Sequence, residues 1–159
     1  MVNFDNAATS FPKPYEVEEA MLSALKKYGG NPGRSGHRLS METAEAVYKA
    51  REICGEFFGA EPENTVFTLN CTSALNFAIK GMTGSKGHIV TSDLEHNSVI
   101  RPVSTVTKSS GSFTQAHVSD DDEKTFAAFE EAITPDTKVI VCTAASNVTG
   151  QILPFERIA

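Results

Sequence analysis

The chain has 159 residues, a length that suits one domain with a sizeable core. Its formal net charge of −6 argues against nucleic acid as the main partner, because a phosphate backbone requires clustered lysine and arginine. No apolar run approaches the roughly 20 residues that span a bilayer, and the chain does not open on a signal peptide, so we expect no membrane association. Its three cysteines show no metal-site spacing, which predicts no metal and a reducing, cytoplasmic setting.

The first third of the chain is predicted to hold two helices separated by a polar loop. After an irregular segment at 3–14, apolar residues recur at helical spacing. They are Val17, Ala20, Met21, Ala24, Leu25 and Tyr28. The glycine-rich stretch 29–33 stops this helix, and residues 31–39 form a polar loop. A second helix is expected to begin at Ser40 as its N-cap and to end at Gly59.

From residue 65 onward, short β-branched runs alternate with helical patterns. The expected strands are 65–69, 88–91, 113–118 and 138–142. The expected helices are 73–82, 97–108 and 123–133, with the acidic run 120–123 as a solvated turn before the last. The alternation predicts an α/β fold, an incomplete three-layer αβα sandwich with a mostly parallel sheet. The tail at 152–159 begins a further helix without an end, which suggests a fragment. Cys54 and Cys142 lie in apolar stretches and are predicted to be core residues.

Three of the expected strands run directly into polar clusters, at 70–73, 92–97 and 145–150. In open α/β sheets, ligands bind just beyond the C-terminal ends of parallel strands. The three clusters therefore deliver hydrogen-bonding groups to one edge of one sheet, which predicts a small-molecule site there.

Each cluster also has a plainer interpretation. The start of the helix after residue 70 could bind an anion, or Thr72 or Ser73 could simply cap it. His96 could stack on a flat ring or move a proton near neutral pH, or it could be a satisfied structural residue. Asn147 could orient a phenolic oxygen or a carboxylate, or serve as a turn residue. The cationic loop at 31–38 could supply donors to an anionic substrate, or could be a mobile surface loop.

Taken in order, five segments resemble the cysteine desulfurases of the class V, fold type I pyridoxal-phosphate (PLP) aminotransferase superfamily. They are 5–10, 31–37, 71–73, 95–97 and 146–150. The resemblance covers essentially the whole chain. It implies that residues 1–39 are an N-terminal helix and active-site loop. It also implies that residues 40–159 are the N-terminal part of the PLP-binding large domain.

The resemblance also implies roles for particular residues. The backbone N–H of Cys71 and the hydroxyl of Thr72 match the phosphate cradle of PLP. His96 matches the catalytic histidine that stacks on the pyridine ring, and Asn147 matches the residue that contacts the phenolic oxygen and the substrate carboxylate. Ala8 and His37 match positions near the substrate. Ser73 departs from the acidic residue that is common after the threonine.

The implied reaction converts L-cysteine to L-alanine and transfers the sulfur to a protein thiol, in a homodimer that passes sulfur to an acceptor protein. Other class V PLP enzymes, such as an aminotransferase or a selenocysteine lyase, remain alternatives, as does a non-catalytic binding module of the same fold. The family's Schiff-base lysine, in a Ser-x-His-Lys setting, lies beyond the Asn147 motif. We therefore expect this chain alone to be inactive. The family also places strands from the missing part between those present here, which would leave sheet edges unpaired.

Overall fold

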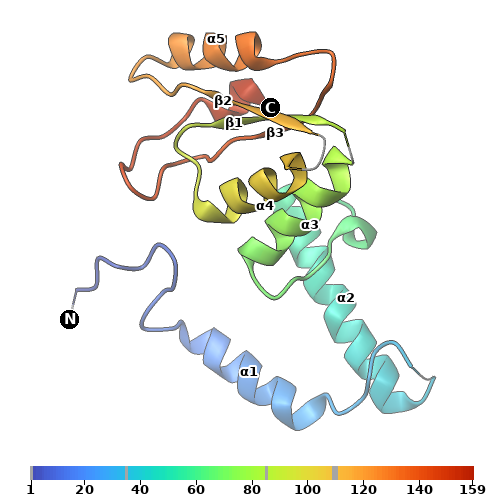
Figure 1. Ribbon diagram of the computed structural model, residues 1–159. Helices are drawn as coiled ribbons and strands as arrows, with labels where there is room; N and C mark the ends of the chain where they lie inside the picture. The colour runs from blue at the N-terminus through green and yellow to red at the C-terminus, as the bar shows by residue number, and fades with distance from the viewer. Residues whose placement is uncertain (1, 35, 85, 109–110) are drawn as a thin grey trace. The chain divides into compact units, whose positions relative to one another are not determined.

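A computed structural model describes residues 2–34, 36–84, 86–108 and 111–159 (Figure 1). Ser35, part of the loop motif, lies outside these ranges. The chain forms two compact units that divide between Phe67 and Thr68. The division at residue 39 concerns the domains of a whole enzyme and stays a prediction. Within the described ranges, no helix has both the length and the apolar character that a membrane span requires.

The N-terminal unit contains two helices, α1 (Tyr15–Lys27) and α2 (Arg38–Phe58), and a short 3-10 helix η1 (Pro62–Asn64). Both α-helices were expected. Glutamates in the first turn of α1 and lysines in its last turn complement the helix dipole. Helix α2 ends at Gly59, as predicted, because this glycine adopts the left-handed conformation, with φ of 67°.

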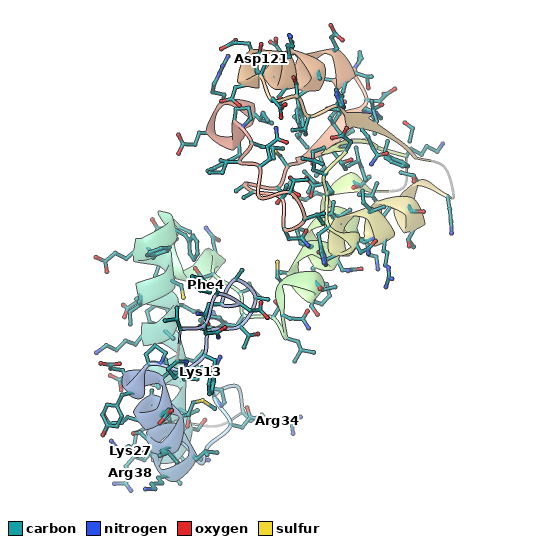
Figure 2. The ribbon with its side chains drawn as sticks, turned by 90° about the vertical axis from the view of Figure 1, so that its left-hand side faces the viewer. Phe4, Lys13, Lys27, Arg34, Arg38 and Asp121 are labelled. Atoms are coloured by element: carbon teal, nitrogen blue, oxygen red, sulfur yellow. The ribbon has the colours of Figure 1, made fainter. Side chains whose placement is uncertain are left out.

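The N-cap of α2 is His37, and the prediction that Ser40 caps this helix is wrong. The ring Nδ1 of His37 accepts a hydrogen bond from the Ser40 amide at 3.3 Å. Ser40 is 1% exposed, and its hydroxyl donates to the carbonyl of Asn31 at 2.6 Å. Ser40 therefore fastens the polar loop to the first turn of α2. Arg34 in this loop and Arg38 at the start of α2 are labelled in Figure 2.

The expected strand at 65–69 is not formed, and this segment is irregular. Val66 is 73% exposed and Leu69 is 90% exposed. None of the strands in the described part of the chain pairs with it, so its backbone groups have no ladder to join. An apolar, β-branched run supplies the propensity for a strand but not the neighbour that a strand needs.

The C-terminal unit is built on a parallel sheet in the order β2-β1-β3. The three strands lie close to the predicted ranges, at β1 (His88–Ser92), β2 (Ser112–Ala116) and β3 (Thr137–Val141). Strand β1 is central and buried along its whole length, as expected for a strand that is covered on both faces.

Helices cover both faces of this sheet (Figure 1). Helices α3 (Cys71–Thr83) and α4 (Asn97–Thr107) pack on one face through Ile79, Val99 and Val103, which contact Ile89 of β1. Helix α5 (Asp122–Ala132) and the short α6 (Phe155–Ile158) lie on the other face, where Phe129 packs near Val90. The incomplete three-layer αβα sandwich is therefore confirmed.

The helix boundaries in this unit follow from caps. Asp121, labelled in Figure 2, accepts hydrogen bonds from the amides of Glu123 and Lys124 and so starts α5 at Asp122, inside the acidic run 120–123 rather than after it. Helix α3 begins two residues before the expected position because its cap lies further upstream, as described below.

Candidate functional site

A cavity of about 390 Å³ opens within the C-terminal unit at the C-terminal edge of the sheet. Its lining includes Cys71, Thr72, Glu95, His96, Cys142 and Asn147. These residues come from the start of α3, the turn after β1 and the loop after β3. The four residues that the sequence assigned to the cofactor, Cys71, Thr72, His96 and Asn147, are thus brought together.

The start of α3 is capped by Asn70, so the alternative in which Thr72 or Ser73 is the cap is wrong. The Asn70 side chain accepts a hydrogen bond from the Ser73 amide at 2.9 Å. Its extended backbone, with φ of −166°, places the carboxamide against the first turn. The Thr72 hydroxyl is therefore not needed for capping, and it lines the cavity beside the positive end of the helix dipole.

His96 is both a helix cap and a wall of the cavity. Its Nδ1 accepts a hydrogen bond from the Ser98 amide at 3.0 Å, which caps α4. Because Nδ1 acts as the acceptor, the proton of the neutral ring lies on Nε2. The ring is exposed and lines the cavity. The structural and the functional interpretations of this histidine are therefore compatible.

Asn147 sits in a turn whose backbone is held by other residues. The buried Ser146 hydroxyl accepts from the amides of Val148 at 3.3 Å and Thr149 at 3.2 Å. The amide of Gly150 donates to the Ser146 carbonyl at 2.9 Å, and Gly150 has a φ of 74° that suits glycine. Since Ser146 and Gly150 build the turn, the Asn147 carboxamide is available to the cavity that it lines.

Two titratable residues that line this cavity, Glu95 and Cys142, were not assigned a role in the site from the sequence. The Glu95 carboxylate accepts hydrogen bonds from the Ser92 hydroxyl and the Thr143 amide, both at 2.7 Å. Cys142, expected in the core, is half-buried and lines the cavity, as Glu95 does. Burial, and then the negative charge of Glu95, raises the pKa of the Cys142 thiol to about 11. No local pattern in the sequence indicates the contacts of Glu95 with the loop after β3, because the bond to Thr143 joins residues 48 positions apart.

The two remaining predicted residues, Ala8 and His37, belong to the N-terminal unit. Ala8 is exposed in a bend, and His37 caps α2. Their approach to a substrate stays a prediction.

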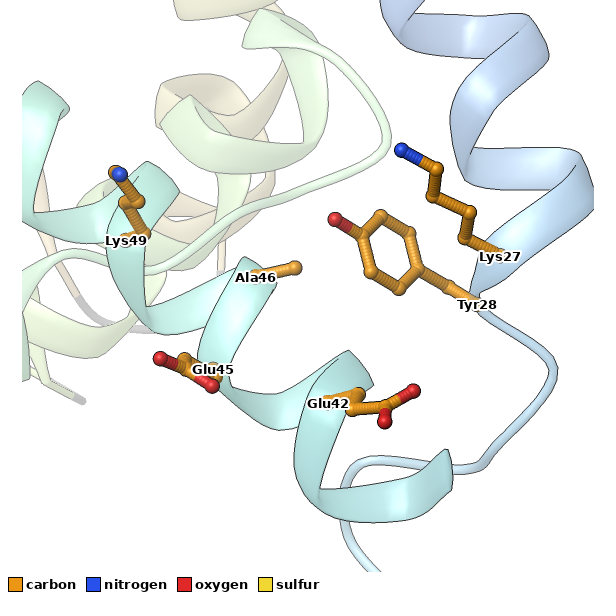
Figure 3. A pocket seen from close by; sticks show the side chains of 6 residues that line it. All are labelled: Lys27, Tyr28, Glu42, Glu45, Ala46 and Lys49. Atoms are coloured by element: carbon orange, nitrogen blue, oxygen red, sulfur yellow. The ribbon is translucent and has the colours of Figure 1, made fainter. Parts of the chain in front are cut away.

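A separate cavity of about 440 Å³ lies in the N-terminal unit, between the end of α1 and α2 (Figure 3). It is lined by Lys27, Tyr28, Glu42, Glu45, Ala46 and Lys49. None of the predicted site residues is among them, and the two lysines and two glutamates balance in charge. In the part of the chain that the structure describes, no group of three histidine, cysteine or acidic side chains is placed to hold a metal ion.

The sequence model of the aminotransferase class-V family matches residues 2–159. The chain belongs to this family. It is 35% identical to the cysteine desulfurase IscS of Dictyoglomus turgidum, over 99% of this chain and 41% of that protein. It is 30% identical to the mitochondrial cysteine desulfurase of Saccharomyces cerevisiae, over 99% of this chain and 32% of that protein. The chain thus spans less than half the length of these relatives.

Two solved structures have a fold similar to that of this chain. The apo cysteine desulfurase of Thermococcus onnurineus matches with a TM-score of 0.82 and 31% identity, over 98% of this chain and 39% of that one. A structure described as SspA in complex with cysteine matches with a TM-score of 0.81 and 29% identity, over 92% of this chain and 43% of that one.

The donors around the 390 Å³ cavity fit PLP. Its volume lies within the roughly 300–1,000 Å³ typical of small-molecule sites. A helix N-terminus with a hydroxyl suits a phosphate, a flat exposed imidazole suits an aromatic ring, and a carboxamide suits a phenolic oxygen. The lining residues include no lysine that could form a Schiff base.

Proposed function

We propose that this chain is the N-terminal, cofactor-facing part of a PLP-dependent cysteine desulfurase-like enzyme. One observation carries the proposal: Cys71, Thr72, His96 and Asn147, from three separate segments of the chain, line a single cavity of about 390 Å³. The 35% identity to a cysteine desulfurase supports the reaction type, and a similar structure described as a complex with cysteine supports the substrate.

In this proposal the chain's own residues bind and orient the cofactor. The Cys71 amide and the Thr72 hydroxyl, at the positive end of α3, would hold the phosphate. The His96 ring would stack on the pyridine ring and offer its Nε2 proton, and the Asn147 carboxamide would bond the phenolic oxygen. PLP, when bound, supplies an electron sink for the reaction at the amino acid.

The proposed substrate is L-cysteine, with Ala8, His37 and Asn147 on the substrate side, and the proposed products are L-alanine and a protein-bound sulfur. Cys142 is not the sulfur acceptor in this scheme. The nucleophile is a thiolate, and burial together with Glu95 raises the Cys142 pKa to about 11. A homodimer, a cytoplasmic setting and a sulfur-acceptor protein are parts of the proposal that rest on the resemblance alone.

The binding part of this proposal is tested by titrating PLP into the isotope-labelled chain. We expect resonances of Thr72, His96 and Asn147 to shift together. Thr72→Ala should weaken binding by about 0.5–3 kcal/mol, a range that runs from the loss of a neutral hydrogen bond to the loss of one to a charged group. Thr43→Ala is the matched control, because its hydroxyl donates within α2 to the Leu39 carbonyl. Shifts spread over unrelated surfaces, or equal affinity of the two variants, would count against the proposal.

The catalytic part is tested by turnover. The chain alone, with PLP and L-cysteine, should release neither alanine nor sulfide, because the Ser-x-His-Lys setting is not among its 159 residues. Borohydride reduction should mark no single lysine, and one specific adduct would contradict this expectation. In an enzyme that contains this segment and the lysine, His96→Ala should slow turnover about 10²–10⁴-fold, as for a positioned acid–base group.

A further inference from the structure

Two carboxylates in the turn after β1 reach in opposite directions to the loops that follow the neighbouring strands. Asp93 accepts a hydrogen bond from the Val118 amide, beyond β2, at 3.1 Å. Glu95 accepts one from the Thr143 amide, beyond β3, at 2.7 Å. Because β1 is the central strand, this turn is tied to both of its neighbours at the edge that carries the cavity.

The loop that Glu95 binds is closed by its own hydrogen bonds. Fixing Thr143 at one end therefore fixes the position of the rest of the loop. The Thr143 hydroxyl donates to the Ala145 carbonyl at 2.9 Å. The Leu153 amide donates to the Ala144 carbonyl at 3.0 Å, and the Ser146 amide donates to Gln151 at 2.9 Å. Asn147 lies in the turn of this closed loop. Its position at the cavity therefore depends on where Thr143 is held.

The carboxylate itself is held in place. The hydroxyl of Ser92, which is 0% exposed, donates to the same Glu95 oxygen at 2.7 Å. A short bond from a buried donor fixes the side-chain conformation of Glu95, so the second bond to Thr143 is directional. The neighbouring residue, His96, caps α4 from the same turn.

We propose that Glu95 is a positioning residue of the cofactor cavity: its carboxylate fixes the loop at 143–150 against the turn that carries His96, so that Asn147 and His96 face one ligand. The identity of that ligand rests on the proposed function, whereas the connection between the two loops does not. Glu95 acts through Thr143 and does not itself contact the reacting atoms.

The first experiment measures hydrogen exchange of the Thr143 amide in the cofactor-free chain. This amide lies beyond the last residue of β3, yet we expect it to be protected. Glu95→Ala should accelerate its exchange about 10- to 150-fold, the range for a lost hydrogen bond to a charged group. Glu95→Gln keeps an acceptor oxygen and should stay within about 3-fold of the native chain.

Asp93→Ala is the matched control, because it removes a carboxylate from the same turn without touching Thr143. It should accelerate exchange at Val118 and leave Thr143 unchanged. Free exchange of Thr143 in the native chain, or unchanged exchange in Glu95→Ala, would overturn the proposal. If Glu95→Ala does not fold, the native chain and Glu95→Gln still decide the matter, since both must protect Thr143.

The second experiment asks whether the connection matters to the ligand. With PLP added, Glu95→Ala should lose the shift of the Asn147 side chain but keep those of Thr72 and His96, and Glu95→Gln should restore it. An Asn147 shift that survives intact in Glu95→Ala would overturn the positioning role. No shift at Thr72 and His96 in the native chain would refute the proposed cofactor site instead, and the exchange experiment would still test the connection.

Discussion

The two units of the chain have similar amphipathic helices but differ in how much apolar surface they bury. In the C-terminal unit, Ile89, Val90 and Phe129 are 0–2% exposed, and they lie on both faces of the sheet. Among the described residues of the N-terminal unit, only Ser40 and Gly55 are buried, and α1 buries none. A helical stripe predicts a helix, but burial requires a second apolar surface, which in this chain is the sheet.

The same difference separates the two halves of the predicted site. His96 and Asn147 stand on the segments that follow β1 and β3, and Thr72 lies in the first turn of α3, which packs on the sheet, so all three are held by the unit with the apolar core, as a preorganised site requires. Ala8 and His37 belong to the unit with little buried surface. Regions with few buried apolar contacts open at lower free energy than core strands. We therefore expect the cofactor side of the site to be rigid in this chain and the substrate side to open readily.

The comparison is tested most strongly by removing one phenylalanine from each unit. Phe129→Ala, at 2% exposure, should destabilise the C-terminal unit by about 3–5 kcal/mol, because it removes buried surface and leaves a cavity. Phe57→Ala, at 80% exposure, should change stability by no more than about 0.5 kcal/mol. Urea unfolding, followed through resonances of each unit, measures both. A cost at Phe57 equal to that at Phe129 would mean that the N-terminal unit has a core of its own.

Cysteine alkylation compares the units at half-buried thiols. Cys142 has its pKa raised from the ordinary 9.0 to about 11, first by burial and then by Glu95, so at pH 8 it holds about 100-fold less thiolate than an ordinary cysteine. Iodoacetamide should therefore label Cys142 far more slowly than Cys54 of the N-terminal unit. The rate at Cys142 should rise about tenfold per pH unit between 8 and 10, since this range lies below its pKa.

The sign of the electrostatic contribution can be checked in the same way. Glu95→Gln removes a negative charge, which lowers the pKa of Cys142 and should speed its labelling. The neutral thiol favours the folded state below about pH 9, and this advantage is lost as the pH rises through about 11. Labelling in urea is the control, because all three cysteines should then react alike. Equal rates at Cys54 and Cys142 in the folded chain would contradict the difference between the units.

The sequence predicts the strands and helices well where local pattern and tertiary partner agree. β1, β2 and β3 fall near their expected ranges because each finds a parallel neighbour within the chain. The run at 65–69 is also apolar and β-branched, yet it forms no strand, because none of the described strands pairs with it. Caps are predicted less well. His37 and Asn70 replace Ser40 and Thr72 or Ser73 because which side chain meets a free amide depends on local backbone angles.

The walls of the cavity were predictable, and the contacts that hold them were not. His96 and Asn147 follow the ends of β1 and β3, and parallel strands end at a common edge, so their convergence follows from topology. Thr72 lines the same cavity although the strand expected before it is not formed, because α3 packs on the sheet through Ile79. The bond from Thr143 to Glu95 depends on side-chain geometry between segments 48 residues apart. The raised pKa of Cys142 depends on the same contact and on burial. A single sequence does not indicate which distant residues contact each other, so neither the hydrogen bond nor the raised pKa could be predicted from it.

The smallest expected effect compares two histidines that play the same structural part in different units. His37 caps α2 by accepting from the third helical amide at 3.3 Å, and His96 caps α4 by accepting from the second at 3.0 Å. Alanine at either position should cost about 1 kcal/mol, and asparagine, a good N-cap, should restore most of it. Thermal unfolding of the single and double variants measures these costs, which should add because the caps belong to different helices.

The substitutions at the two histidines should have different effects once PLP is present. His96→Asn restores the cap but lacks a flat ring, so it should recover stability without recovering the PLP-induced shift at Thr72. His37→Asn should leave that shift unchanged in this chain, because His37 does not line the cavity of the C-terminal unit. If His96→Asn binds PLP as the native chain does, the ring of His96 serves only as a cap, and the two histidines are equivalent.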